Sequence, residues 1–474
     1  VKVETLGQLK EALGVVKTLM TRENRLHDAF MSGIATALCA EFIEVLKYID
    51  GAEPYTAPCY GHLPDAIVRS LGVPLVTGDI PGVPVILGKA PTTQEAVDLV
   101  KSYQAQGMLV TLVGGVIDQL EEAGVKTGDN LRVIPLGKEV TSVIHVVSVA
   151  VRAALIFGNI QPGDAAGLMK YTFERVPAFV NAFAPLDDVI VACGAGAIAL
   201  GFPVITNEQE NIFRVPKSLI VQPDVEKFNA TSLEARDIKI KITNIDIPVS
   251  FASAFEGEII RRPDMQVEVD GSRVDCFELV HTKEAAEIED HKITVIGPEI
   301  DEIPVGSKIS MSYTVDVAGK AMQPDFESVM ERKFHSYLNC IEGVMHTGQR
   351  DMIRIRISKA DFEAGFKFRH IGEVLYAKVK SEFEAVVDKC QVTIVVDAEK
   401  NKELRAAANA VFNKRDDRLK SMTDESVPVY YTCIMCQAFS PSHVCIVTPE
   451  RLGLCGAVSW LDAKATNELD PQGP

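Results

Sequence analysis

The sequence lacks any run of about 18 uncharged apolar residues, roughly the length that a helix needs to cross a membrane. Its N-terminus also lacks a basic stretch followed by a short apolar core, the pattern of a secretory signal. Positive charge is in deficit, with 48 Lys and Arg against 65 Asp and Glu. Because phosphate binding requires clustered positive charge, we expect a soluble, unexported protein that binds neither membranes nor nucleic acid.

Cysteine is too scattered for a disulfide framework. The chain has ten cysteines in 474 residues, whereas frameworks belong to short, cysteine-dense secreted domains. A reducing cytoplasm is therefore the expected location. Six of the ten lie far apart in sequence and mostly among apolar neighbours, so buried thiols explain them: Cys39, Cys59, Cys193, Cys276, Cys340 and Cys390.

The length predicts about three domains. From 1 to 240, helical stretches alternate with short apolar runs, which is typical of an α/β domain with a parallel sheet covered by helices. Strict alternation at Ile238–Ile242 predicts a strand with one wet face, and it opens a mixed α+β domain over 241–405. We expect 406–474 to be the start of a third, α+β domain.

Individual elements follow from the same patterns. In the first domain we expect helices at 92–103, 116–123, 140–157 and 165–183, and strands at 108–112, 131–134 and 189–192. Pro135 is expected to stop the strand at 131–134. In the second domain we expect strands at 265–269, 276–280, 308–315, 353–357 and 392–396, and helices at 325–344, 359–364, 371–388 and 400–418.

Gly194 and Gly196 fit the loose form G-x-G-x-x-A of a dinucleotide-binding fingerprint. The strand expected at Phe202–Ile205 follows too closely for a full crossover helix. No acidic residue stands in a clear strand-end position about 20 residues further on. Close packing of a short helix is therefore favoured, with nucleotide binding as the minor alternative.

Two further groups of residues have a functional and a plain interpretation. The basic stretch around 350–380 offers guanidinium groups for the phosphates of a nucleotide-bearing thiol carrier, although a solvated face is favoured. His335, Cys340 and His346 lie close in sequence, but their spacing does not place them on one helical face. Packing or surface roles are therefore favoured over metal ligation. The basic residues are Arg350, Arg354, Arg356, Lys359, Lys367, Arg369, Lys378 and Lys380.

The close cysteine set has the spacing C-x2-C-x8-C-x9-C and consists of Cys433, Cys436, Cys445 and Cys455. A C-x-x-C turn delivers two sulfurs to one point, and two later cysteines complete a coordination shell. Zinc ribbons usually present two such pairs, and only one exists here. The surrounding apolar residues suit a metal cluster kept from water. An iron-sulfur cluster, for electron transfer or as part of a catalytic metal site, is favoured over structural zinc.

The stretch Tyr431–Arg451, continued by Leu454–Trp460, resembles acetyl-CoA synthase. This is the nickel subunit of the bifunctional carbon monoxide dehydrogenase/acetyl-CoA synthase complex. The expected order of domains also resembles the bacterial form of that enzyme, which has an N-terminal domain that the archaeal subunit lacks. The resemblance covers essentially the whole chain and implies an acyltransferase, the CO-methylating acetyl-CoA synthase.

The resemblance implies that Cys433, Cys436, Cys445 and Cys455 bind a four-iron four-sulfur cluster. The sulfur of Cys436 would also bridge to a proximal nickel, where carbon monoxide, a methyl group from a corrinoid iron-sulfur protein and coenzyme A are combined into acetyl-CoA. Phe439 would lie over the nickel and control access, although a core phenylalanine is equally compatible with the sequence.

The resemblance also assigns roles to the other domains. The first domain would dock onto the carbon monoxide dehydrogenase subunit and carry part of a gas tunnel. The apolar helix Val140–Phe157 would line that tunnel or belong to an ordinary core. The middle domain would supply contacts to coenzyme A.

The sequence departs from the family at one point. The family holds a second, distal nickel in a Cys-Gly-Cys tripeptide, and no C-x-C occurs in this chain. The chain opens without methionine and stops soon after Cys455, so we expect a fragment whose complete gene encodes that tripeptide beyond Pro474. The alternative function is an iron-sulfur module for electron transfer or structure, without catalytic nickel.

Overall fold

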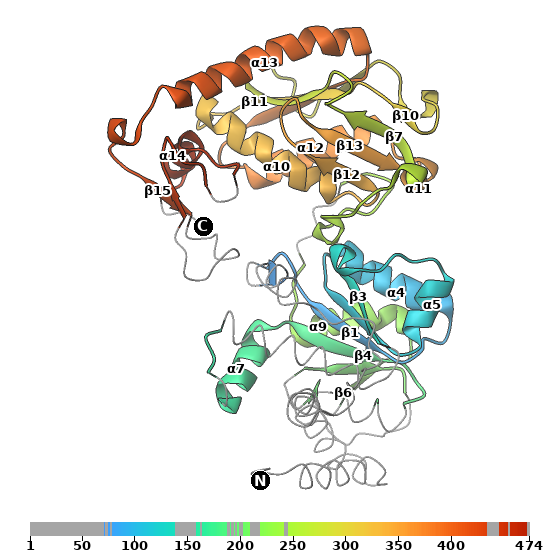
Figure 1. Cartoon of the computed structure of the whole chain (residues 1–474). Coiled ribbons are helices and arrows are strands. Elements are labelled where there is room, and N and C mark those ends of the chain that lie inside the picture. Colours follow the sequence, from blue (N-terminus) through green and yellow to red (C-terminus); the bar gives the residue numbers. More distant parts are fainter. Residues whose placement is uncertain are drawn as a thin grey trace, which may run out of the picture. The chain divides into compact units, whose positions relative to one another are not determined.

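In the computed structural model the chain divides into two units, Val1–Ile242 and Thr243–Pro474 (Figure 1). The structure describes residues 78–137, 158–161, 164–186, 202–208, 219–240, 245–433, 445–453 and 456–471, with a few single residues in 71–75 and 190–198. Among these residues no helix is both long enough and apolar enough to span a bilayer.

A parallel sheet forms the centre of the first unit. Its strands are β1 (Val83–Leu87), β2 (Val110–Val113), β3 (Val133–Gly137), β4 (Ala178–Ala182), β5 (Val204–Thr206) and β6 (Leu219–Val221). They lie in the order β3-β2-β1-β4-β5-β6, and every neighbouring pair is parallel. This is the strand order of doubly wound α/β folds, in which the direction of winding reverses between β1 and β4. The parallel α/β sheet expected from the sequence is confirmed.

Apolar residues cover both faces of this sheet. One face packs against α4 (Thr93–Ala105), α5 (Val116–Glu122) and α9 (Phe228–Arg236). The helix α4 begins where the sequence predicts, because the Thr92 side chain accepts a hydrogen bond from the Glu95 N–H. The opposite face packs against several residues between β4 and β5 and against Tyr171 of α7 (Ala165–Arg175). Burial on both sides explains the continuous apolar runs of these strands.

Three predictions for the first unit are wrong. The strand at 131–134 continues through Pro135 in β3, because β3 is an edge strand and a missing N–H is tolerated there. The helix expected over 165–183 ends at Arg175, and β4 follows Pro177. Residues 238–240 are not in a strand; Ile238 and Ile240 pack against the core. The helix expected at 140–157 lies outside the described residues.

The second unit contains two mixed four-stranded sheets, as the sequence predicts for an α+β region. One has the order β10-β7-β13-β12 and the other the order β8-β11-β14-β9. The first consists of β7 (Met265–Asp270), β10 (Ser307–Lys308), β12 (Val344–Thr347) and β13 (Arg354–Ser358). The second consists of β8 (Phe277–Thr282), β9 (Ile293–Ile296), β11 (Ser312–Ala318) and β14 (Lys389–Val395).

One apolar core joins the two sheets. It includes residues of both sheets and of the helices α10 (Glu327–Asn339) and α12 (Phe368–Glu382). A short helix, α11 (Lys359–Glu363), follows β13 and begins where the Ser358 side chain accepts a hydrogen bond from the Asp361 N–H. Three predicted elements differ here. The helix expected over 371–388 ends at Glu382. The strand 308–315 is split into β10 and β11, and the helix 325–344 ends at Asn339, so that β12 can form.

A long charged helix, α13 (Ala398–Lys420), lies across the second unit (Figure 1). Its apolar contact is small and consists of Leu404, Ala408, Val411 and Phe412 against two residues of β8. Ion pairs hold the rest of the helix, with Arg405 near Asp275 and Arg418 near Asp325. Ion pairs therefore hold α13 on the second unit more than apolar burial does, which explains why its sequence is charged and exposed.

Candidate metal centre

The predicted cysteine site begins on a short hairpin. It consists of β15 (Tyr431–Cys433) and β16 (Cys445–Val447), which pair in antiparallel register. Cys433 lies directly opposite Cys445 in this register. Residues opposite one another in an antiparallel pair have their Cβ atoms about 5 Å apart. The backbone thus brings together two of the four cysteines that the spacing singled out.

Cys445 is 4% exposed. It packs in a cluster with Val447, Trp460 and Leu461, and Tyr431 lies against the same cluster. The rings of Tyr431 and Trp460 are 5.6 Å apart between centroids and tilted by 52°. The inner wall of the hairpin is therefore apolar and aromatic, which agrees with the apolar setting inferred from the sequence.

The helix α14 (Trp460–Leu469) ties this hairpin to the core of the second unit. Ser459 and Asp462 form a capping box at its N-terminus. Asp462 is buried, forms an ion pair with Arg332 of α10, and accepts a hydrogen bond of 2.9 Å from the Ser328 hydroxyl. At the hairpin end, the indole N–H of Trp460 donates to the Val429 carbonyl at 3.0 Å. The hairpin is thus held at a fixed place on the second unit.

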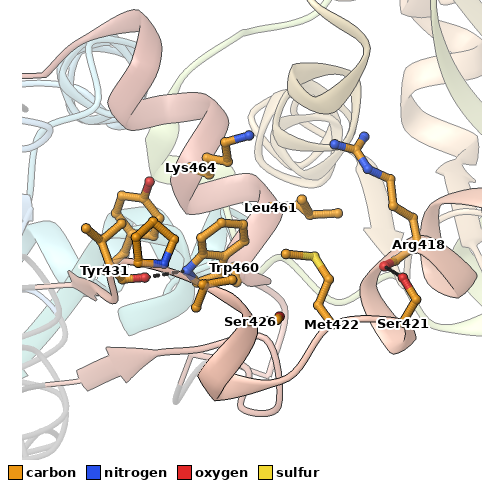
Figure 2. A pocket seen from close by; sticks show the side chains of 11 residues that line it. Arg418, Ser421, Met422, Ser426, Tyr431, Trp460, Leu461 and Lys464 are labelled. Atoms are coloured by element: carbon orange, nitrogen blue, oxygen red, sulfur yellow. Dashed lines mark hydrogen bonds between the residues drawn. The ribbon is translucent and has the colours of Figure 1, made fainter.

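A cavity of about 460 Å³ lies beside the hairpin (Figure 2). Tyr431, Trp460, Leu461 and Met422 supply much of its wall, and Arg418 and Lys464 also line it. Its polar groups already have partners within the protein: Arg418 donates to Asp325 at 2.8 Å, and Lys464 is 3.5 Å from Glu468. The sequence analysis missed this aromatic wall. The one tryptophan of the chain, five residues after Cys455, was the available signal.

The other predicted site residues, Cys436, Phe439 and Cys455, lie outside the described residues, as does the Cys433 side chain. Among the side chains that the structure describes, no group of three or more His, Cys, Asp or Glu is arranged to hold a metal. The four-cysteine site and the position of Phe439 therefore stay predictions.

Three of the six scattered cysteines are buried, as predicted: Cys276, Cys340 and Cys390. Burial raises the pKa of the Cys276 and Cys390 thiols to about 12 in each case. These two thiols are therefore protonated at neutral pH when no metal is bound. Cys39, Cys59 and Cys193 lie outside the described residues.

The glycine motif does not have the setting of a dinucleotide fingerprint. Ile190 and Gly194 are helical, so the strand expected at 189–192 is wrong at the residue that can be examined; Gly196 lies outside the described residues. In this fold the fingerprint belongs to the loop after β1. There, a Cβ on Gly88 would lie 3.3 Å from the Phe183 carbonyl oxygen and 3.4 Å from Ile190. Gly88 therefore allows close packing against the segment that follows β4.

The basic stretch is neutralised within the protein. Arg354 lies 3.1 Å from Asp270, Arg356 bonds Glu268 at 2.6 Å through its Nε, and Arg350 bonds Asp416 at 2.8 Å. Lys359 donates to the Pro263 carbonyl at 2.6 Å. These partners favour the structural interpretation over phosphate binding. Lys367, Arg369, Lys378 and Lys380 likewise lie near carboxylates.

Three family models match the chain. Residues 1–49 match the "Carbon monoxide dehydrogenase subunit alpha N-terminal domain". Residues 247–401 match the "CO dehydrogenase/acetyl-CoA synthase complex beta subunit". Residues 412–474, which include the four cysteines, match the model for the C-terminal part of the ACS/CODH beta subunit.

Two curated relatives are similar over the whole chain. The carbon monoxide dehydrogenase/acetyl-CoA synthase subunit alpha of Moorella thermoacetica is 42% identical over 477 residues, which are 100% of this chain and 65% of the relative. The acetyl-CoA decarbonylase/synthase complex subunit beta 1 of Methanocaldococcus jannaschii is 41% identical over 473 residues, 100% of this chain and 62% of the relative. The chain thus spans somewhat under two thirds of the length of either relative.

The archaeal match corrects one expectation, because it extends through the first unit. The N-terminal part is therefore not confined to the bacterial form. A second subunit of the same archaeon, beta 2, is 46% identical over 229 residues and matches only 48% of this chain. The solved structure of carbon monoxide dehydrogenase IV from Carboxydothermus hydrogenoformans overlaps 36% of this chain and 34% of its own, at 15% identity and a TM-score of 0.29, too low to bear on the fold.

The three family models and the two relatives that match the chain from end to end agree with the resemblance carried by the cysteine region. The chain contains segments of these families and is homologous over its whole length to subunits of carbon monoxide dehydrogenase/acetyl-CoA synthase complexes.

Proposed function

We propose that this chain carries the cluster-binding part of an acetyl-CoA synthase, which condenses carbon monoxide, a corrinoid-bound methyl group and coenzyme A. The observation that carries the proposal is the hairpin register, because it sets Cys433 opposite Cys445 inside the segment that matches the family's C-terminal model. Cys436 and Cys455 would complete a four-cysteine set around one four-iron four-sulfur cluster.

The chemistry of four thiols and the surroundings of Cys445 support this proposal. Cys445 is buried beside Val447 and Trp460, so its thiolate would be poorly hydrated until a metal neutralises it. Binding would release the thiol proton, and cluster loading should therefore weaken at low pH. When bound, a nickel held by Cys436 would supply a soft, electron-rich centre able to bind carbon monoxide and accept a methyl group.

The chain's own residues would position and shield that centre. Tyr431 and Trp460 close the inner side of the hairpin, and α14 fixes it to the second unit through Asp462. Phe439, three residues after Cys436, is proposed to limit access to the metal from outside. The first unit is proposed to dock onto a carbon monoxide dehydrogenase subunit, as the names of the relatives suggest.

Metal content and carbon monoxide binding, measured on the protein as its gene encodes it, test this proposal. The anaerobically purified protein should contain iron and nickel, give a paramagnetic resonance signal that depends on carbon monoxide, and form acetyl-CoA from a methylated corrinoid protein. Iron without nickel, together with no response to carbon monoxide, would instead support the alternative of an electron-transfer or structural module.

A further inference from the structure

Two histidines whose spacing in the sequence did not predict a contact lie next to each other in the second unit. His335 lies on α10 and His346 on β12, and their Nδ1 atoms are 3.3 Å apart. His346 is fully buried, whereas His335 reaches solvent. Asn339 fixes the backbone of His346: its Oδ1 accepts the His346 N–H at 2.8 Å, and its Nδ2 donates to the His346 carbonyl at 3.0 Å.

A buried carboxylate continues the contact inward. Glu278 of β8 is 1% exposed, and its Oε2 lies 2.9 Å from His346 Nε2. The same oxygen accepts a hydrogen bond from the Tyr313 hydroxyl of β11. The backbone N–H of Arg350 donates to the other oxygen at 3.3 Å. Three donors thus surround one carboxylate.

These contacts fix the proton positions. Because Glu278 is an acceptor, His346 carries a proton on Nε2. In the neutral pair, the single remaining proton between the rings sits on His335 Nδ1 and points to His346 Nδ1. When His335 gains a proton on Nε2, its Nδ1 proton can cross to His346 Nδ1. His346 is then an imidazolium, which donates one hydrogen bond to Glu278 and one to His335. Both states satisfy the same hydrogen bonds.

We propose that His335, His346 and Glu278 form a proton relay, through which the centre of the second unit exchanges one proton with solvent. The proton enters at His335 Nε2 and is stored on His346 beside Glu278. A second proton is excluded, because two N–H groups cannot face each other across 3.3 Å. Partial burial and the neighbouring His346 also lower the pKa of His335, and Glu278 opposes this shift.

Further polar groups lie around the relay. Asn339 Nδ2 is 3.4 Å from His335 Nδ1 and 3.3 Å from His335 Nε2, and the Tyr313 hydroxyl is 3.4 Å from His346 Nε2. Tyr313 is fully buried, and burial and the Glu278 charge raise its pKa, so it stays a donor. Cys276, which precedes β8, is protonated because burial raises its pKa to about 12. Glu331 of α10 is paired with Arg415 of α13. Arg350 pairs with Asp416 of α13. Burial raises the pKa of Glu331 to about 7, so this carboxyl, which feels the charge of Glu278, also titrates near neutrality.

Histidine 15N resonances of the full chain, followed against pH, test the relay. The variants His335→Asn and His346→Asn assign the signals. Both rings should titrate together in one step. Glu278→Gln should lower the apparent pKa of that step by about one unit or more, because it removes the partner charge. His335→Asn should leave His346 neutral throughout. Two results would overturn the proposal. One is a titration of the His335 resonances with no change in those of His346, and the other is an apparent pKa that Glu278→Gln leaves unchanged.

A matched control is the His291–Glu373 pair, in which the histidine is exposed and the contact is 3.0 Å, against 2.9 Å between His346 and Glu278. Glu373→Gln should change the 15N resonances of His291 alone. If Glu278→Gln does not fold, Tyr313→Phe replaces it. Loss of that donor makes the carboxylate more basic, so the shared step should move to higher pH, and an unmoved step would count against the relay.

Discussion

At the scale of single residues, Arg415 closes the open edge of the sheet that begins with β8. The N–H groups of Val280 and Thr282 donate to Glu331 and Glu327 at 2.9 and 2.8 Å, where a neighbouring strand would otherwise accept. Arg415 bonds both carboxylates, at 2.8 Å to Glu331 and 2.6 Å to Glu327. Side chains of two helices thus replace a missing strand.

Replacing Arg415 with methionine should therefore lower the free energy of unfolding by about 3 to 5 kcal/mol, because two buried carboxylates lose their counter-charge. Urea unfolding measures the loss. The control is Arg418→Met, one turn further along α13, where the side chain is 52% exposed. That change should cost no more than about 1 kcal/mol. Equal losses in the two variants would contradict this account of the edge.

Glu331 also makes stability depend on pH. Burial raises its pKa from 4.5 to about 7, against the opposing effect of Arg415. A folded-state pKa above the unfolded value means that the stabilisation is complete at low pH and is lost as the pH rises through the folded pKa. Relative to Glu331→Gln, the parent should lose on the order of 3 kcal/mol of unfolding free energy between about pH 5 and pH 8. Parallel stability curves would show that Glu331 does not titrate in this range.

At the scale of elements, Gly372 lets α12 approach β9 closely. A Cβ at this position would lie 2.5 Å from Ile293 Cγ2. Gly372→Ala should therefore destabilise the protein by about 1 to 3 kcal/mol, although alanine is the better helix former. Adding Ile293→Ala should recover part of the loss in thermal unfolding, because it removes the clashing methyl group. A stabilising Gly372→Ala would show that helix propensity outweighs the contact.

Elements were predictable where local signals agreed with the tertiary environment. Thr92 and Glu95 mark the start of α4 correctly because the cap is a local hydrogen bond. The prediction that Pro135 stops the strand was wrong, because a strand tolerates proline when it lies at the sheet edge, as β3 does. The apolar stretch 165–183 was also misread, because a buried parallel strand and a buried helix look alike in an apolar run.

At the scale of the whole molecule, the sequence predicts ligand residues for the candidate site but not the residues that surround them. The spacing of Cys433, Cys436, Cys445 and Cys455 is itself a ligand pattern. The aromatic wall of Tyr431 and Trp460 depends on how α14 docks, and no local pattern encodes that contact. The spacing of His335 and His346 likewise did not predict their contact, because helical periodicity does not describe a helix that packs against the next strand.

We propose that Cys445 belongs to a metal-cluster set and that a cysteine buried elsewhere does not. Cys390 is the matched control, since it is 0% exposed in β14, while Cys445 is 4% exposed in β16. Iron and sulfide content with Mössbauer spectra, measured after anaerobic reconstitution of the parent, Cys445→Ser and Cys390→Ser, decides the matter. We predict a four-iron four-sulfur cluster in the parent and in Cys390→Ser, and a lost or incomplete cluster in Cys445→Ser. An intact cluster in Cys445→Ser would contradict the account.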